Sequence, residues 1–181
     1  QPSIDVHSGF RAGLVRKAES GDMEEVMKRY YRSYFEHRTR CAPAVQVGVR
    51  VSGDSVDVDA GKFIEHLKYL NESFGPRPFF LPCLWISHEG HKMPADEEWK
   101  GLKIFANADL TELDPKFEAL FTEYMRQLIQ VMKDEDLFHD PIVRFIDEPD
   151  LDDKATINGI HTIASMLTKL DPAIIVSLTA T

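Results

Sequence analysis

The feature that most constrains the fold is a regular alternation between amphipathic helical patterns and short, mostly apolar runs. Apolar side chains recur at helical spacing in four stretches, residues 22–36, 60–73, 114–131 and 154–170. Strand-like runs lie between them, at residues 40–47, 78–85, 142–146 and 173–178, with one further candidate within residues 1–10. Strands and helices that alternate at this spacing predict βα units and a parallel sheet.

Two of the apolar runs, residues 142–146 and 173–178, lack strict alternation of apolar and polar residues. Such strands are typical of a parallel sheet that is covered on both faces. The starts of two helices are also marked. Asp59 is predicted to cap the helix over 60–73, and Asp114 and Pro115 are predicted to form the N-cap and first position of the third helix.

Two architectures fit this pattern, an open doubly wound sheet and a parallel (β/α)₈ barrel of the TIM type. The sequence contains no glycine-rich phosphate-binding loop, which removes the main reason to prefer a nucleotide-binding open sheet. A full barrel needs about 250 residues, so the 181 residues predict an incomplete barrel of about four to five βα units. We expect residues 1–181 to form a single domain, whose open sheet edges favour self-association.

The charge balance argues against two classes of partner. The 21 basic and 30 acidic residues give a formal net charge of −9, and the basic residues form no cluster. Nucleic-acid binding requires a basic footprint, and attraction to an anionic membrane requires a polybasic stretch. No apolar run approaches the length of a membrane-spanning helix. A neutral, polyhydroxylated substrate such as a sugar is compatible with this composition.

The sequence says little about the compartment. Cys41 and Cys83 fit no zinc or redox motif and are expected to be buried thiols, although a disulfide is possible in an exported protein. No signal segment is present, but the chain begins with Gln1 rather than Met. We therefore expect it to be part of a longer protein, and the missing signal does not decide its location.

The strongest local signal for chemistry is Asp147-Glu148-Pro149-Asp150, directly after the apolar run 142–146. The carboxyl ends of parallel strands carry the active sites of βα architectures. Two adjacent carboxylates repel each other, which raises the proton affinity of at least one. A glycosidase needs such a protonated carboxyl group to protonate the leaving oxygen, and Glu148 has the reach for that role.

Neighbouring strand residues point to opposite faces, so Asp147 and Glu148 can serve one site only if the strand ends there. Pro149 supports such an end, because proline cannot donate to a sheet ladder. The alternative interpretation is that these acids are solvated turn residues or cap the following helix.

The chain resembles the catalytic domain of glycoside hydrolase family 123 and its uncharacterised relatives. The resemblance rests on four segments that occur in the family's order, across about residues 20 to 180. They are Tyr30-Tyr-Arg-Ser-Tyr-Phe-Glu-His-Arg38, Val56-Asp-Val-Asp-Ala-Gly-Lys-Phe63, Leu113-Asp-Pro-Lys-Phe117 and Ile142-Val-Arg-Phe-Ile-Asp-Glu-Pro-Asp150.

The resemblance implies a (β/α)₈ barrel and retaining hydrolysis of a terminal β-linked N-acetylhexosamine, with N-acetylgalactosamine favoured. The nucleophile is then the substrate's own 2-acetamido oxygen. Asp147 orients that group, and Glu148 protonates the leaving oxygen and later activates water. No metal or organic cofactor is implied, and a secreted or periplasmic location is slightly favoured. The last barrel strands are missing from this chain, so the fragment alone is not required to be active.

Other polar residues near predicted strand ends are secondary candidates. Trp85 could stack on a sugar face, and His88 could contact a sugar hydroxyl. His88 and His91 offer metal ligands, but no third ligand is apparent and no metal site is predicted. Arg144 is a charge inside an apolar strand, where it either neutralises a carboxylate in the barrel interior or faces solvent at an open edge.

Two rival functions remain open. The chain could be a non-catalytic carbohydrate-binding or scaffold domain that keeps the barrel without its activity. It could also be an unrelated α/β hydrolase with a metal at His88 and His91. Carboxylates that face a common pocket would favour the glycosidase, and carboxylates that cap a helix would favour the scaffold domain.

Overall fold

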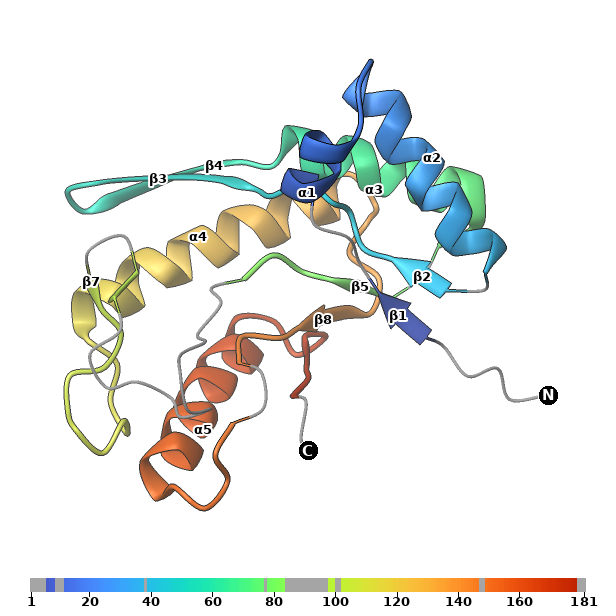
Figure 1. The fold of residues 1–181 in the computed structure, drawn as a ribbon. Helices are drawn as coiled ribbons and strands as arrows, with labels where there is room; N and C mark the ends of the chain where they lie inside the picture. The colour runs from blue at the N-terminus through green and yellow to red at the C-terminus, as the bar shows by residue number, and fades with distance from the viewer. Residues whose placement is uncertain are drawn as a thin grey trace. The chain divides into compact units, whose positions relative to one another are not determined.

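The computed structural model describes residues 6–8, 12–37, 39–76, 78–83, 98–99, 102–146 and 149–178. These residues form a mixed α/β fold with helices and short parallel strands (Figure 1). The chain divides into two units. The first comprises residues 1–47 and 59–77, and the second comprises residues 48–58 and 78–181.

The first unit contains a pair of parallel strands, β1 (Val6–Ser8) and β2 (Thr39–Cys41), in the register Val6 to Thr39. Helices α1 (Ala12–Ala18) and α2 (Met23–Glu36) connect them, and α3 (Gly61–Phe74) follows later in the chain. A parallel pair joined through helices is a βα unit. The predicted helix over 22–36 is confirmed, with Asp22 as N-cap, and the candidate strand within residues 1–10 is present.

The start of α3 differs from the prediction. The N-cap is Ala60, which has no side chain to accept a hydrogen bond, and Asp59 is the last residue of the preceding strand. The Asp59 carboxylate nevertheless accepts a hydrogen bond from the Gly61 amide at 3.1 Å. The carboxylate therefore satisfies the first amide of the helix from one residue further out than predicted.

The second unit contains a three-stranded parallel sheet in the order β5–β8–β9. Its strands are β5 (Phe79–Phe80), β8 (Pro141–Val143) and β9 (Ile175–Val176). Helix α4 (Pro115–Asp134) connects β5 to β8, and α5 (Lys154–Leu170) connects β8 to β9 (Figure 1). Both helices confirm the predicted segments. The spatial order of the strands is their order along the chain.

Two β-hairpins were not predicted. The first joins β3 (Gly48–Ser52) to β4 (Ser55–Asp59) through Gly53, whose φ of 62° suits a tight turn. The Gln127 side chain on α4 donates to the Val56 carbonyl at 2.9 Å. The second hairpin pairs β6 (Glu98–Trp99) with β7 (Leu102–Lys103) in antiparallel fashion. The predicted strand over 40–47 is wrong beyond its start, since residues 42–47 are irregular.

The two faces of the β5–β8–β9 sheet differ in burial. Register and alternation place two sets of residues on opposite faces. The buried face carries Phe79, Leu81, Pro141, Val143, Phe145 and Ile174. The other face carries Phe80 and Ile142, which are partly exposed, and Ile175, which is 48% exposed. Among the described residues, the first face is therefore the more buried of the two, and the second face is partly open.

Among the described residues, the parallel strands form a pair and a three-stranded sheet but no closed barrel. Neighbouring strands in both sheets follow each other directly along the chain, apart from the inserted hairpins. The coarse prediction of an α/β fold with a parallel sheet is confirmed.

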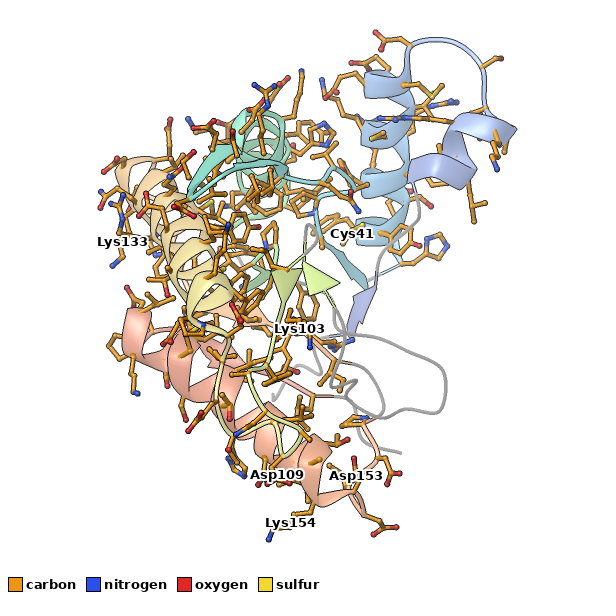
Figure 2. The ribbon with its side chains drawn as sticks, turned by 90° about the vertical axis from the view of Figure 1, so that its left-hand side faces the viewer. Cys41, Lys103, Asp109, Lys133, Asp153 and Lys154 are labelled. Carbon is orange, nitrogen blue, oxygen red and sulfur yellow. The ribbon has the colours of Figure 1, made fainter. Side chains whose placement is uncertain are left out.

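An ion pair joins the last turn of α4 to the turn before β9. The ammonium of Lys133, which is labelled in Figure 2, is a donor to the carboxylate of Asp171. Asp171 is only 8% exposed. Burial alone would raise the pKa of Asp171, but hydrogen bonds from Lys133 and the Ala173 amide outweigh it and lower the pKa. The charged form of Asp171 is therefore favoured in the folded state.

We expect Asp171→Asn to lower the free energy of unfolding by about 1 kcal/mol at pH 7, since half-exposed Lys133 is screened by solvent. Because the folded-state pKa is depressed, this stabilisation is present above the unfolded pKa of about 3.9. It is lost as the pH falls through the folded value. Urea denaturation at several pH values below neutral checks this, with exposed Asp152→Asn as control. A difference that persists unchanged at pH 2 would contradict the assignment.

Candidate active site

The predicted functional residues lie outside the described residues. These are the catalytic candidates Asp147 and Glu148, the substrate-binding candidates Trp85 and His88, and the rival metal ligand His91. The structure does describe residues 81–83 and 98–99, which flank the segment with Trp85, His88 and His91. It also describes residues 144–146 and 149–150, which flank Asp147 and Glu148. The site is therefore built from the ends of β5, β8 and β9 and from the start of α5.

Strand β8 is the middle strand of the sheet, and its carboxyl end is fixed from both sides. The Leu81 amide donates to the Ile142 carbonyl at 2.8 Å, and the Ser177 amide donates to the Val143 carbonyl at 2.9 Å. Phe145 and Ile146 continue the chain with exposed fractions of 0% and 1%. The residue before Asp147 in the sequence is thus deeply buried and held by the core.

Past the strand, described residues of the turn into α5 hold its first amides. Pro149 is buried, and the Asp150 carboxylate accepts the Asp152 amide at 3.1 Å. Asp153 is the N-cap of α5 (Figure 2). Its carboxylate accepts the amide of Thr156 at 3.2 Å and the hydroxyl of Thr156 at 2.7 Å. The alternative interpretation of the sequence assigned the capping of this helix to the acids of residues 147–150. In the structure, the N-cap is Asp153.

We expect Asp153→Ala to destabilise the protein by about 1–2 kcal/mol. The substitution removes the cap of α5 and also the acceptor of the Thr156 hydroxyl, which is fully buried. Thermal and urea denaturation measure the loss, with Asp152→Ala, one residue earlier and exposed, as the matched control. Equal stability of the two variants would mean that the cap has been assigned to the wrong residue.

The carboxyl edge of the sheet carries a positive charge on its partly open face. Arg144 follows β8 directly and shares a face with Ile142 and Phe80. Its guanidinium carbon lies 4.9 Å from the centre of the Phe80 ring, which ends β5. The Arg144 Nε atom is buried and has no hydrogen-bond acceptor among the described residues. The Arg144 side chain as a whole is partly buried, and both positions predicted for it stay open.

The segment after β5 is anchored from α4. The Tyr124 hydroxyl donates to the Pro82 carbonyl at 3.0 Å. Burial raises the pKa of Tyr124, and the nearby Cys83 thiol contributes in the same direction. Tyr124 is therefore a neutral donor over the whole working range of pH. Cys83, like Cys41 in the first unit, is partly buried rather than fully buried as expected.

The described residues contain no candidate metal site. Within the described ranges, no group of three or more His, Cys, Asp or Glu side chains is placed to hold a metal ion. His88 and His91 fall outside those ranges, so the metal-dependent alternative stays a prediction. No helix in the described part of the chain is long and apolar enough to cross a membrane.

A polar cluster in the first unit was missed by sequence reasoning. The Tyr31 hydroxyl accepts the Ala44 amide at 2.8 Å and donates to His66 Nδ1 at 2.7 Å. His66 Nε2 then lies 3.2 Å from the Glu24 carboxylate. Tyr31 and His66 are 1% and 2% exposed, so a substrate cannot reach them. The cluster is structural, and only the helical spacing of Tyr31 in α2 and His66 in α3 hinted at it.

We expect Tyr31→Phe to cost about 1–3 kcal/mol, because it leaves His66 Nδ1 and the Ala44 amide without their partner. Tyr30→Phe is the matched control, since it removes one bond to Glu19 from a less buried hydroxyl. Urea denaturation of both variants gives the comparison. A Tyr31→Phe loss as small as that of the control would show that the cluster contributes nothing to stability.

A groove of about 720 Å³ lies between α4 and α5. Its lining is about equally polar and apolar, and its polar residues include Thr111, Glu112, Glu118, Asn158, His161 and Lys169. Asn158 and Thr162 on α5 donate to the carbonyls of Asp109 and Leu110. At the groove, the loop that contains Asp109 and Leu110 is thus hydrogen-bonded to α5. Its lining includes no residue of β5, β8 or β9.

The comparisons with known proteins add no relative. No protein-family model matches the chain. No curated protein matches it either. The fold alone defines the class of the protein, which is a mixed α/β protein with a short parallel sheet.

Proposed function

We propose that this chain is part of a retaining glycoside hydrolase that removes a terminal β-linked N-acetylhexosamine, with N-acetylgalactosamine as the favoured sugar. Glu148 is the general acid and base, and Asp147 orients the 2-acetamido group that acts as nucleophile. The proposal rests on the family resemblance of the sequence segments. It needs no metal or organic cofactor.

One structural observation carries the proposal. Asp147 and Glu148 follow, after three residues, the carboxyl end of β8, the central strand of a parallel sheet. Active sites of βα architectures lie at this end of the strands. The N-cap of the next helix is Asp153, five residues past Glu148 in the sequence.

The strand order is compatible with the barrel that the proposal implies, and equally with one half of a doubly wound sheet. In an open sheet the strand order reverses at a switch point, where the ligand binds. The described strands of the second unit run in sequence order, without a reversal. In a barrel, the partly open face with Phe80, Ile142 and Ile175 would be the interior face.

The deciding experiment is an assay of the full-length protein on an aryl β-N-acetylgalactosaminide, with the anomer of the product followed by NMR. Retention of the β-configuration supports the proposal, since substrate-assisted hydrolysis inverts the anomeric carbon twice. Product of inverted configuration would exclude this mechanism. Binding of the sugar without any release of the aryl group would establish the rival function, a non-catalytic carbohydrate-binding domain.

A further inference from the structure

We propose that the groove between α4 and α5 binds a short peptide of about three residues through its free amino and carboxyl termini. The groove lies wholly within the second unit, and every residue that lines it is described. Its volume of about 720 Å³ falls within the range of roughly 300–1,000 Å³ that is typical of small-molecule sites. The inference goes beyond the proposed hydrolysis and does not depend on it, because neither Asp147 nor Glu148 lines the groove.

The groove carries opposite charges toward its two ends. The loop before α4 is tied to α5 by a hydrogen bond from the Thr162 hydroxyl to the Leu110 carbonyl. Glu112 follows in the same loop, and Glu118 lies in the first turn of α4. Lys169 lies in the last turn of α5 and lines the same groove. The two carboxylates are therefore gathered where the loop enters α4, and the ammonium lies toward the other end.

The spacing of these charges defines the length of the ligand. Lys169 follows Thr162 on the same face of α5, two helical turns later, which is about 10 Å along the helix axis. An extended peptide advances about 3.3 Å per residue, so three residues also span about 10 Å. A tripeptide can therefore place its ammonium near Glu112 and Glu118 and its carboxylate near Lys169.

The charged side chains at the two ends lack partners within the described part of the chain. The side chains of Glu112, Glu118 and Lys169 form no hydrogen bond or ion pair there. Elsewhere on α4 the charges are paired, as in the contact of 2.7 Å between Arg126 and Glu123. A ligand that carries both charges would therefore pair with each end of the groove without displacing an internal contact. Hydrogen bonds between charged groups are about twice as strong as those between neutral groups.

The middle of the groove suits the amide groups and small side chains of a peptide. Thr122 and Ser165 contribute hydroxyls, which can either donate to a peptide carbonyl or accept from a peptide N–H. Leu113, Met166 and Leu170 supply the apolar part of the lining. The lining contains no Phe, Tyr or Trp on which a sugar ring could stack. The groove therefore fits a peptide better than it fits a second sugar.

The test is calorimetric titration of the full-length protein with trialanine. Two further probes, N-acetyl-trialanine and trialanine amide, each lack one terminal charge. We expect each of them to bind at least about tenfold more weakly than trialanine, a difference of about 1.4 kcal/mol.

Substitutions at the two ends should match the two capped probes. Lys169→Met should weaken the binding of trialanine at least about tenfold, but it should leave the affinity for the amide unchanged, since the amide has no carboxylate. The double variant Glu112→Gln and Glu118→Gln should act in the same way on trialanine and leave the affinity for N-acetyl-trialanine unchanged. Ser165 is exposed, so Ser165→Trp should fill the groove without disturbing the core and abolish the binding of trialanine.

Lys154→Met is the matched control, because Lys154 is an exposed lysine at the start of α5 that does not line the groove (Figure 2). It should leave all three affinities unchanged. Absence of trialanine binding by the wild type would overturn the inference, and so would equal binding of trialanine and both capped forms. Binding that survives Ser165→Trp would place the peptide elsewhere on the protein. Tighter binding of the capped forms would assign the groove to an internal segment of a protein partner, and this result would also overturn the inference.

Discussion

Replacing Glu148 by glutamine in the full-length protein is expected to lower kcat on an aryl β-N-acetylgalactosaminide by about 10²–10⁴-fold. Glutamine has nearly the same shape but cannot give a proton to the leaving oxygen. The loss should grow as the leaving group becomes more basic, because poor leaving groups depend most on protonation. Initial rates on a series of aryl and alkyl glycosides measure both effects.

Two neighbouring substitutions make this result specific. Asp150→Asn changes a carboxylate two residues away, which accepts the Asp152 amide, and should leave kcat within a few-fold of the wild type. Asp147→Asn should lower the rate on all leaving groups alike, because it acts on the acetamido nucleophile. Undiminished turnover by Glu148→Gln would remove Glu148 from the mechanism.

The second large effect is expected in the core behind the site. Phe145 is 0% exposed and lies on the sheet face opposite Arg144. We expect Phe145→Ala to lower the free energy of unfolding by about 3–5 kcal/mol, through lost apolar burial and the cavity that remains. This is a large part of the 5–15 kcal/mol that holds typical domains together. Urea denaturation followed by circular dichroism measures it.

Two control variants distinguish the effect of side-chain volume at residue 145 from the effect of removing an apolar side chain at an exposed position. Phe145→Leu keeps much of the volume and should cost less than about 2 kcal/mol. Val131→Ala removes an apolar side chain that is 37% exposed on α4, and should change stability by only about 0.5 kcal/mol. A small effect of Phe145→Ala would mean that the end of β8 is not anchored by its core face, and would weaken the argument for a well-defined site.

The helices could be predicted from the sequence because their signals are local. The apolar stripe of α4 and its Asp114-Pro115 start specify the helix within one short segment, and the Asp114 carboxylate accepts the amides of Lys116 and Phe117. The start of α3 was harder. Its cap residue is Ala60, which carries no capping signal, and the preceding Val56-Asp-Val-Asp59 segment forms a strand.

The strands were located but their lengths were overestimated. Apolar composition extends from 142 to 146, whereas the ladder of β8 covers Pro141–Val143. An apolar composition indicates that residues are buried, but not that they form the hydrogen bonds of a strand. Phe145 and Ile146 are buried although they lie outside β8. The hairpin of β3 and β4 was missed because its alternation of small, polar and valine residues is short and lacks a run of apolar residues.

The location of the candidate site stays a prediction, whereas its surroundings are described by the structure and were not predicted. The sequence marks the acidic pair after residue 146, and the structure adds that β8 is central and that Asp153 caps α5. The contact between Arg144 and Phe80 joins residues 64 positions apart in the numbering. Such a contact depends on strand register, which no local pattern in the sequence specifies.

The way the two units share the chain has a practical consequence for dissecting the protein. The polypeptide passes from one unit to the other three times, after residues 47, 58 and 77. Truncation at residue 78 would keep α4 but delete the hairpin whose Val56 is 3% exposed and whose carbonyl binds Gln127. Neither unit can be excised as one uninterrupted piece, so gene fusions and deletion libraries should keep both together.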